Sequence, residues 1–334
     1  MNEASLSRGL IVIASIFIII AGLKVAQPIV MPVLVAFFLA ALTSPAVNLL
    51  VRFRMPLGIA ITVVVVLLIG FFYALGRVLG NSTEQFLDRL PDYQHQLELW
   101  LVQLKDKVPW LIEDIEQRIA EFQPTDSAIA IVGRLFSGVG SVLTAIVLIV
   151  FTLIFTLLES RNASEKLRIA FGDDKTIGYI KRFSKMVQRY LLVKSLISLA
   201  TGILVAILLI FLGVDYPILW GTFAFLMNFI PNVGSLLAAI PPMILAGLQL
   251  GLPGFLITTG GFVAINMIIG NLIEPRLMGK TLDISPLIVF LSLVIWGWIL
   301  GPIGMLLSIP LTVVIKIALE VYPGTRWIAE LISQ

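Results

Sequence analysis

The fold is decided by residues 216–273, which read YPILWGTFAFLMNFIPNVGSLLAAIPPMILAGLQLGLPGFLITTGGFVAINMIIGNLI. These 58 residues contain no charged side chain, and prolines interrupt them at positions 231, 241, 242 and 253. A bilayer core about 30 Å thick is crossed by about 20 apolar helical residues, so the stretch is long enough to cross it more than once. Proline cannot continue the hydrogen bonding of a helix. We therefore expect helices that are broken inside the membrane.

The first break is expected at Pro231-Asn232-Val233-Gly234. The residues before it, 216–230, would form about 22 Å of helix at 1.5 Å per residue. This length is too short to cross the bilayer but long enough to pass its midplane. A re-entrant hairpin over residues 216–249 therefore fits, in which the second helix returns to the side from which the first one entered.

A second segment repeats this pattern. The run from Pro302 to Pro310 aligns with the run that begins at Pro231, with two single-residue gaps, and Gly304 then falls opposite Gly234. One full span, residues 254–273, separates the two hairpins, so the hairpin over 286–316 would enter from the opposite side. Broken helices of an inverted repeat that meet near the midplane are a recurrent transporter binding site. The alternative is a pair of ordinary proline-kinked spans.

The composition excludes most other classes of protein. The chain is 59% hydrophobic and only 13% charged, with a mean hydropathy of +1.03, whereas soluble domains have about 25% charged residues. It has no cysteine and one histidine, His95, which leaves no material for thiolate metal sites, cysteine nucleophiles or a multi-histidine centre. We expect no enzyme, no cofactor and no metal site, and the net charge of +3 gives no basis for nucleic-acid binding.

We expect an all-α polytopic membrane protein with about six full transmembrane helices plus two re-entrant broken-helix hairpins in inverted orientation. Residues 81–137 carry ten acidic and five basic side chains, and residues 159–190 carry eight basic and four acidic ones. Positive loops lie in the cytoplasm, so residues 81–137 are expected outside and both chain termini inside. A tight turn is expected at residues 26–28, between the first two spans.

Four regions are expected along the chain. They are transmembrane helices 1–3 (residues 1–80), an external amphipathic helical segment (81–137), transmembrane helix 4 with basic cytoplasmic interfacial helices (138–190) and a C-terminal transport region (191–334). In the external segment, Ser82 and Gln85 are typical of a helix-capping box. This segment either packs on itself and on the membrane surface or forms a subunit contact. The basic helices are expected to meet lipid headgroups.

Neutral amides surround the first break. Asn228 and Asn232 flank it, and Asn266 and Asn271 lie on the span that follows. Amides offer hydrogen-bond donors and acceptors without charge, which suits a small, polar, uncharged solute. The alternative is that each amide only joins neighbouring helices.

Charged residues are scarce near these spans. Glu274 and Arg276 flank Pro275 and could pair with each other or with backbone groups. They could gate the inner mouth, Glu274 could carry a coupling proton, or both could simply end a helix. Asp215 is expected to be a solvated turn residue.

Three stretches, residues 228–242, 270–279 and 296–310, resemble the autoinducer-2 exporter family of bacterial inner-membrane proteins. The resemblance implies export of the quorum-sensing signal autoinducer-2 (AI-2), a small hydroxylated furanone-like molecule, with no catalysed reaction. It also implies an elevator-like moving domain in a homo-oligomer, with a pentamer as one form. The residues expected to bind or translocate the solute are Asn228, Pro231, Asn232, Gly234, Ser235, Asn266, Asn271, Gly301, Pro302 and Gly304, and those expected to gate or to couple ions are Glu274 and Arg276.

Two alternatives to solute export stay open. Some members of the family that the chain resembles exchange sodium or lithium for protons, which would require a titratable carboxylate within reach of the membrane. A protein of another class, a non-transporting membrane scaffold, would assemble through residues 81–137. The sequence has no G-x-x-x-x-G-K-[S/T] motif, so the energy source is expected to be a gradient rather than ATP.

Overall fold

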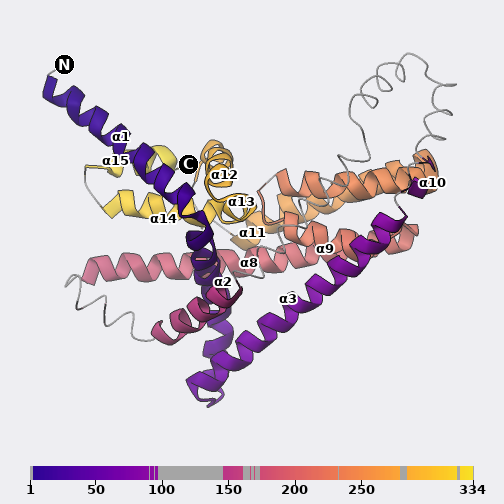
Figure 1. Ribbon diagram of the computed structural model, residues 1–334, viewed down its shortest axis with the longest axis horizontal. Coiled ribbons are helices and arrows are strands. Elements are labelled where there is room, and N and C mark those ends of the chain that lie inside the picture. Colours follow the sequence, from indigo (N-terminus) through magenta and orange to yellow (C-terminus); the bar gives the residue numbers. More distant parts are fainter. Residues whose placement is uncertain are drawn as a thin grey trace. The chain divides into compact units, whose positions relative to one another are not determined.

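The computed structural model describes residues 3–89, 91–93, 95–96, 146–160, 166, 169, 174–231, 233–278, 284–321 and 324–333, and every regular element in these ranges is a helix (Figure 1). The all-helical membrane fold is therefore confirmed, whereas the number of full spans stays a prediction. Most of the expected external segment, 81–137, lies outside the described residues. Four described helices are long and apolar enough to cross a membrane, namely Gln27–Arg52, Leu57–Phe86, Ser184–Leu212 and Val233–Met278, and three shorter apolar ones are Ile146–Glu159, Pro217–Met227 and Pro286–Leu300.

The chain divides into two compact units. Unit 1 comprises Met1–Val65, Ile146–Leu192 and Lys280–Gln334, and unit 2 comprises Val66–Ala145 and Val193–Gly279. The first expected break belongs to unit 2 and the second to unit 1. The four regions expected from the sequence remain a prediction.

In unit 1, α1 (Glu3–Val25) and α2 (Gln27–Arg52) are separated by a turn at Ala26, so the turn expected at residues 26–28 is present but only one residue long. The backbone N–H of Ala26 donates to the carbonyl of Gly22 at 2.9 Å, and that of Val30 donates to the carbonyl of Ala26 at 2.9 Å. Both bonds end on Ala26, and Pro28 lies in the first turn of α2, where a missing backbone donor is tolerated. Figure 1 shows α2 continuing from the end of α1 in a new direction.

The rest of unit 1 surrounds the second break. Here α12 (Pro286–Leu300), α13 (Pro302–Leu306), α14 (Ser308–Val321) and α15 (Arg326–Ile332) follow one another. Leu300, Leu307 and Leu311 form a buried cluster against which side chains of α1 and α2 pack. The start of α8 (Asp174–Leu212) is joined to α2, since Gln188 Nε2 donates to Ser44 Oγ at 3.2 Å.

Unit 2 contains the larger part of α3 (Leu57–Asp88), the second half of α8, α9 (Pro217–Met227), α10 (Val233–Asn266), the π-helix η1 (Met267–Ile273) and α11 (Glu274–Met278). Gly251, at φ 70° and ψ −165°, divides α10 into two helices. The expected capping box at Ser82 and Gln85 is wrong, because α3 runs straight through both residues. Phe86 contributes to this extension, since its ring packs against those of Tyr216 and Trp220.

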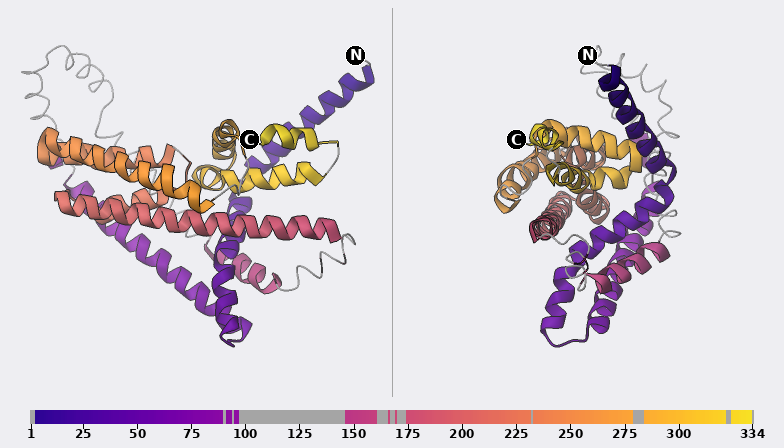
Figure 2. Two further views of the ribbon diagram at one scale, coloured as in Figure 1. Left: turned by 180° about the vertical axis from the view of Figure 1, so that it is seen from behind. Right: turned by 90° about the vertical axis from the view of Figure 1, so that its left-hand side faces the viewer.

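In unit 2, α8 and α9 cross at two glycines. A Cβ placed on Gly221 would lie 2.6 Å from the carbonyl oxygen of Gly202, and one placed on Gly202 would lie 2.6 Å from the carbonyl oxygen of Gly221. Such small residues allow two membrane helices to approach closely. Trp220 and Ala224 of α9 also pack with Ala238 of α10 in one buried cluster, so α8, α9 and the first half of α10 lie side by side (Figure 2).

Candidate functional site

The first predicted break is present in unit 2. After α9, the backbone N–H of Ile230 donates to the carbonyl of Met227 at 2.9 Å, and that of Gly234 donates to the carbonyl of Ile230 at 3.3 Å. Asn232 lies outside the described residues. Gly234 is buried, and a Cβ added to it would overlap the carbonyl oxygen of Met227. The returning helix therefore passes directly against the end of the helix before it.

The second predicted break is present in unit 1. Gly301 adopts φ 71° and ψ −156°, a conformation open chiefly to glycine, and Pro302 starts the next helix. A Cβ added to Gly304 would overlap the carbonyl oxygen of Trp296. The two glycines that the sequence aligned, Gly234 and Gly304, thus occupy the same kind of close approach. The return of each hairpin to the side from which it entered stays a prediction.

A buried polar face on α8 lies beside the first break, and the sequence analysis missed it. Lys194, Ser198 and Thr201 are 5%, 0% and 4% exposed and are spaced four and three residues apart, so they share one face of the helix. Asn228 Nδ2 donates to Ser198 Oγ at 3.0 Å. For Asn228, the structure thus shows the alternative role, a hydrogen bond between two neighbouring helices.

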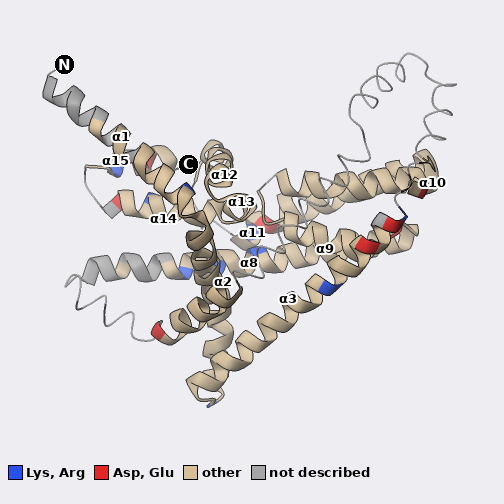
Figure 3. Ribbon diagram, viewed as in Figure 1, with Lys and Arg blue, Asp and Glu red and all other residues tan. Residues whose placement is uncertain are grey.

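Lys194 forms an ion pair with Glu274. Its Nζ lies 2.7 Å from Glu274 Oε1, and the two side chains are 6% and 21% exposed. The partner of Glu274 is therefore Lys194 and not Arg276, which was one of the partners expected and which is exposed. The pair was not predicted from the sequence, since the two partners are 80 residues apart. Figure 3 shows a charged segment of α11 beside one of α8, between long uncharged stretches.

The π-helix η1 directly precedes Glu274. In such a helix each backbone N–H bonds to the carbonyl five residues back, and short π segments are frequent at functional sites. Asn266 precedes η1 and is half-buried, and Asn271 lies within it and is exposed. Two of the residues predicted from the sequence, Asn228 and Glu274, contact α8 rather than each other. Asn228 donates to Ser198, and Glu274 accepts from Lys194, which lies one helical turn before Ser198.

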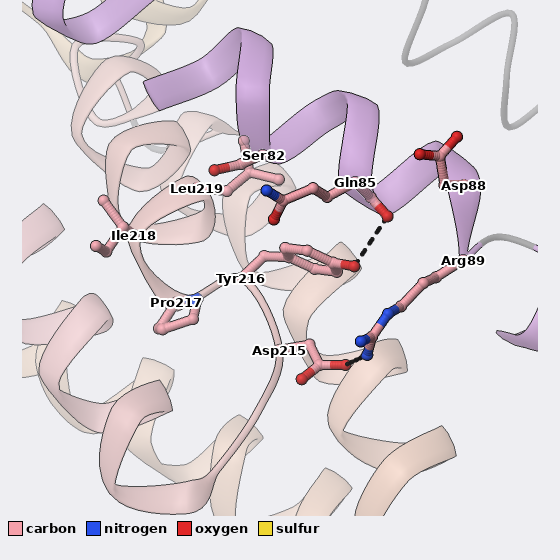
Figure 4. A pocket seen from close by; sticks show the side chains of 9 residues that line it. All are labelled: Ser82, Gln85, Asp88, Arg89, Asp215, Tyr216, Pro217, Ile218 and Leu219. Carbon is pink, nitrogen blue, oxygen red and sulfur yellow. Dashed lines mark hydrogen bonds and ion pairs between the residues drawn. The ribbon is translucent and has the colours of Figure 1, made fainter. Parts of the chain in front are cut away.

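A pocket of about 520 Å³ lies elsewhere in unit 2, between the end of α3 and the start of α9 (Figure 4). Asp215 accepts a hydrogen bond from the Tyr93 hydroxyl at 2.7 Å and an ion pair from Arg89 at 3.5 Å. Asp215 lies in the bend before α9 and its side chain is 37% exposed, so it is partly solvated, as expected, and also has two partners. Burial, followed by the contact with Asp215, raises the pKa of Tyr93. The pocket is lined by Ser82, Gln85, Asp88, Arg89, Asp215, Tyr216, Pro217, Ile218 and Leu219.

Long uncharged helices that are broken at matching glycines, with an ion pair enclosed between two of them, define a polytopic membrane protein of the transporter class. A family profile described as AI-2E family transporter matches residues 12–324. The chain therefore belongs to the AI-2E family transporters, and the family expected from the sequence is confirmed. The family is named for transport and not for a catalysed reaction.

Relatives from two bacteria match along almost their whole length. The chain is 36% identical to the putative transport protein YhhT of Escherichia coli (strain K12), over 97% of this chain and 93% of the relative. It is 34% identical to the AI-2 transport protein TqsA of the same strain, over 97% and 94%. A putative transport protein of Haemophilus influenzae is 38% identical, over 97% and 95%.

Proposed function

We propose that the chain is a secondary transporter that exports AI-2, or a similar small polar uncharged solute, across the bacterial inner membrane. The name of TqsA supports this solute. YhhT, which is similar to the chain to almost the same degree, is named only for transport, so the choice of solute rests on chemistry as well. The amides of Asn228, Asn266 and Asn271 offer hydrogen bonds without charge, as a hydroxylated neutral solute requires.

The paired breaks carry the proposal. Gly234 and Gly304 each let a returning helix pass against a backbone carbonyl, and one break belongs to each unit. Non-helical backbone at membrane depth is tolerated only where protein buries it or a cavity adjoins it. The hairpins over 216–249 and 286–316 are thus proposed to re-enter the membrane and to move in an elevator-like manner. The proposed solute residues are Asn228, Pro231, Asn232, Gly234, Ser235, Asn266, Asn271, Gly301, Pro302 and Gly304, with Glu274 and Arg276 at the gate.

The charge pattern supports a proposed topology. Residues 81–137, with their acidic excess, lie outside, and residues 159–190 and both termini lie in the cytoplasm. Exposed apolar side chains such as Phe211, which is 85% exposed, face lipid or a second copy of the chain in a homo-oligomer.

Flux in proteoliposomes that contain only the purified protein tests the proposal. We expect saturable uptake of AI-2, which Asn232→Ala reduces more than it reduces protein abundance. Gly234→Leu should abolish flux while complexes still form. Na⁺- or Li⁺-dependent proton movement without AI-2 flux would support the antiporter alternative. A folded oligomer with neither flux would support the scaffold.

A further inference from the structure

The Lys194–Glu274 pair joins two helices that are long and apolar enough to cross a membrane. Lys194 belongs to the span Ser184–Leu212, and Glu274 belongs to Val233–Met278. Removing two charges from water is costly, and a buried ion pair often contributes no more stability than apolar side chains of the same size. Ionisable residues inside membrane helices are therefore functional candidates by default. No other ion pair between the described residues has both side chains as little exposed.

The two partners differ in how firmly the fold holds them. Lys194 lies in the middle of α8, which is continuous for 39 residues. Glu274 follows the seven-residue π-helix η1, precedes Pro275 and lies four residues after Gly270, which has no atom within 4 Å of an added Cβ. Helices bend at π segments and at prolines. Glu274 therefore belongs to a segment that can bend, whereas Lys194 belongs to a continuous helix.

Few other ionisable groups surround the pair in the described part of the chain. On α8 the nearest are Arg189, which is exposed, and Tyr190, which is buried four residues before Lys194. On α11 the only other one is Arg276, which is exposed, and η1 has none. Glu274 is thus the one carboxylate shown to balance the charge of Lys194.

We propose that Lys194 carries the proton that couples solute movement to the proton gradient, with Glu274 as its movable counter-ion. When α11 withdraws, the buried ammonium loses the carboxylate that balances its charge. Lys194 releases one proton to water, and Glu274 remains a carboxylate. When α11 returns, Lys194 takes up one proton and the ion pair forms again.

The geometry favours a proton over a metal cation as the coupling ion. An ammonium 2.7 Å from Glu274 Oε1 repels a second cation at that oxygen. The described residues also contain no group of three His, Cys, Asp or Glu side chains that could hold a metal ion. The inference rests on the proposed transport function for its role, whereas the opening of the pair can be measured without any solute.

The opening is tested by thiol labelling, because the chain has no cysteine of its own. A single cysteine replaces Ile273, which is half-buried directly before Glu274, and Ser160→Cys, at an exposed position, gives the reference rate at each pH. We expect the ratio of the two maleimide-labelling rates to rise at least threefold from pH 6 to pH 9. The double variant Lys194→Met/Glu274→Gln should show a ratio that does not change with pH. A constant ratio with the pair intact would overturn the inference.

The coupling is tested by AI-2 flux with and without a pH gradient. In Lys194→Met/Glu274→Gln neither charge is left unpaired, and the ratio of the flux with the pH gradient to the flux without it should fall to about one. Lys316→Met is the matched control, since Lys316 is 5% exposed and lies 3.9 Å from Glu320 in unit 1. It should keep the response. A double variant that still responds to protons, or that responds to Na⁺ instead, refutes the role of Lys194. Absence of flux in the unmodified protein would refute the proposed function. The labelling experiment would then still show whether the Lys194–Glu274 pair opens as the pH rises.

Discussion

Gly234→Ala tests the close approach on which the comparison of the two breaks depends. An added Cβ would overlap the Met227 carbonyl oxygen, lie 2.7 Å from its carbon and lie 3.0 Å from Ile230 Cβ. The obstructing atoms belong to the backbone, so the chain has to move rather than a side chain. Such overpacking costs about 1–3 kcal/mol, and the higher helix propensity of alanine offsets up to about 1 kcal/mol. We expect a net loss of stability of about 1–2 kcal/mol.

Thermal unfolding of the purified protein in detergent measures this loss. At roughly 2–4 °C per kcal/mol for a chain of this order of size, the unfolding temperature should fall by about 2–8 °C. Gly304→Ala should fall similarly, because its added Cβ would overlap the Trp296 carbonyl oxygen. Gly260→Ala, in α10 with no atom within 4 Å, should leave the temperature unchanged or raise it. If Gly234→Ala behaves like Gly260→Ala, the tight return at the first break is wrong.

Three further predictions concern hydrogen bonds. Tyr93→Phe removes the hydrogen-bond donor to Asp215 and should lower stability by about 1–2 kcal/mol at neutral pH. Because folding raises the pKa of Tyr93, this stabilisation is complete below about pH 10 and is lost as pH rises above that. The difference in unfolding temperature between the variant and the unmodified protein should therefore become smaller in strong alkali. Trp296→Phe removes a 3.1 Å bond to a threonine and should cost about 1 kcal/mol, seen as a lower unfolding temperature with unchanged oligomer size. A double-mutant cycle of Asn228→Ala and Ser198→Ala should give a coupling energy of about 0.6 kcal/mol in thermal unfolding. A coupling energy near zero, together with loss of flux in Asn228→Ala but not in Ser198→Ala, would indicate that Asn228 binds the solute and does not mainly join the helices.

The breaks could be predicted from the sequence because proline and glycine act on the backbone at their own positions. Pro231 and Pro302 remove a donor wherever they stand, and Gly301 supplies a positive φ that other residues rarely adopt. The turn expected at residues 26–28 is confined to Ala26, because Pro28 already lies in the first turn of α2. A proline indicates that a helix is interrupted, but the packing of neighbouring residues decides how far the chain changes direction.

The contacts across unit 2 could not be predicted in this way, because they depend on helical register. Lys194 and Glu274 are 80 residues apart, and Tyr93 and Asp215 are 122 apart. A shift of one residue in either helix turns a side chain by about 100°, and the π-helix before Glu274 changes the register without a signal in the sequence. One signal was available: a lysine inside a span requires a partner, and Glu274 is the only carboxylate between residues 216 and 319 that stands directly at the end of an apolar helix.

Helical spacing also shows a relation that alignment of the break motifs misses. Lys194, Ser198 and Thr201 form a buried polar face on α8, and Ser308, Thr312 and Lys316 form one on α14, where they are 0%, 8% and 5% exposed. In each face a serine lies near the break: Ser198 bonds to Asn228, and Ser308 opens the helix that follows α13. The lysine comes before its hydroxyl residues in α8 and after them in α14. Each break is thus accompanied, within its own unit, by a helix that buries one lysine and two hydroxyl residues, a likeness between the units that the prolines and glycines alone do not show.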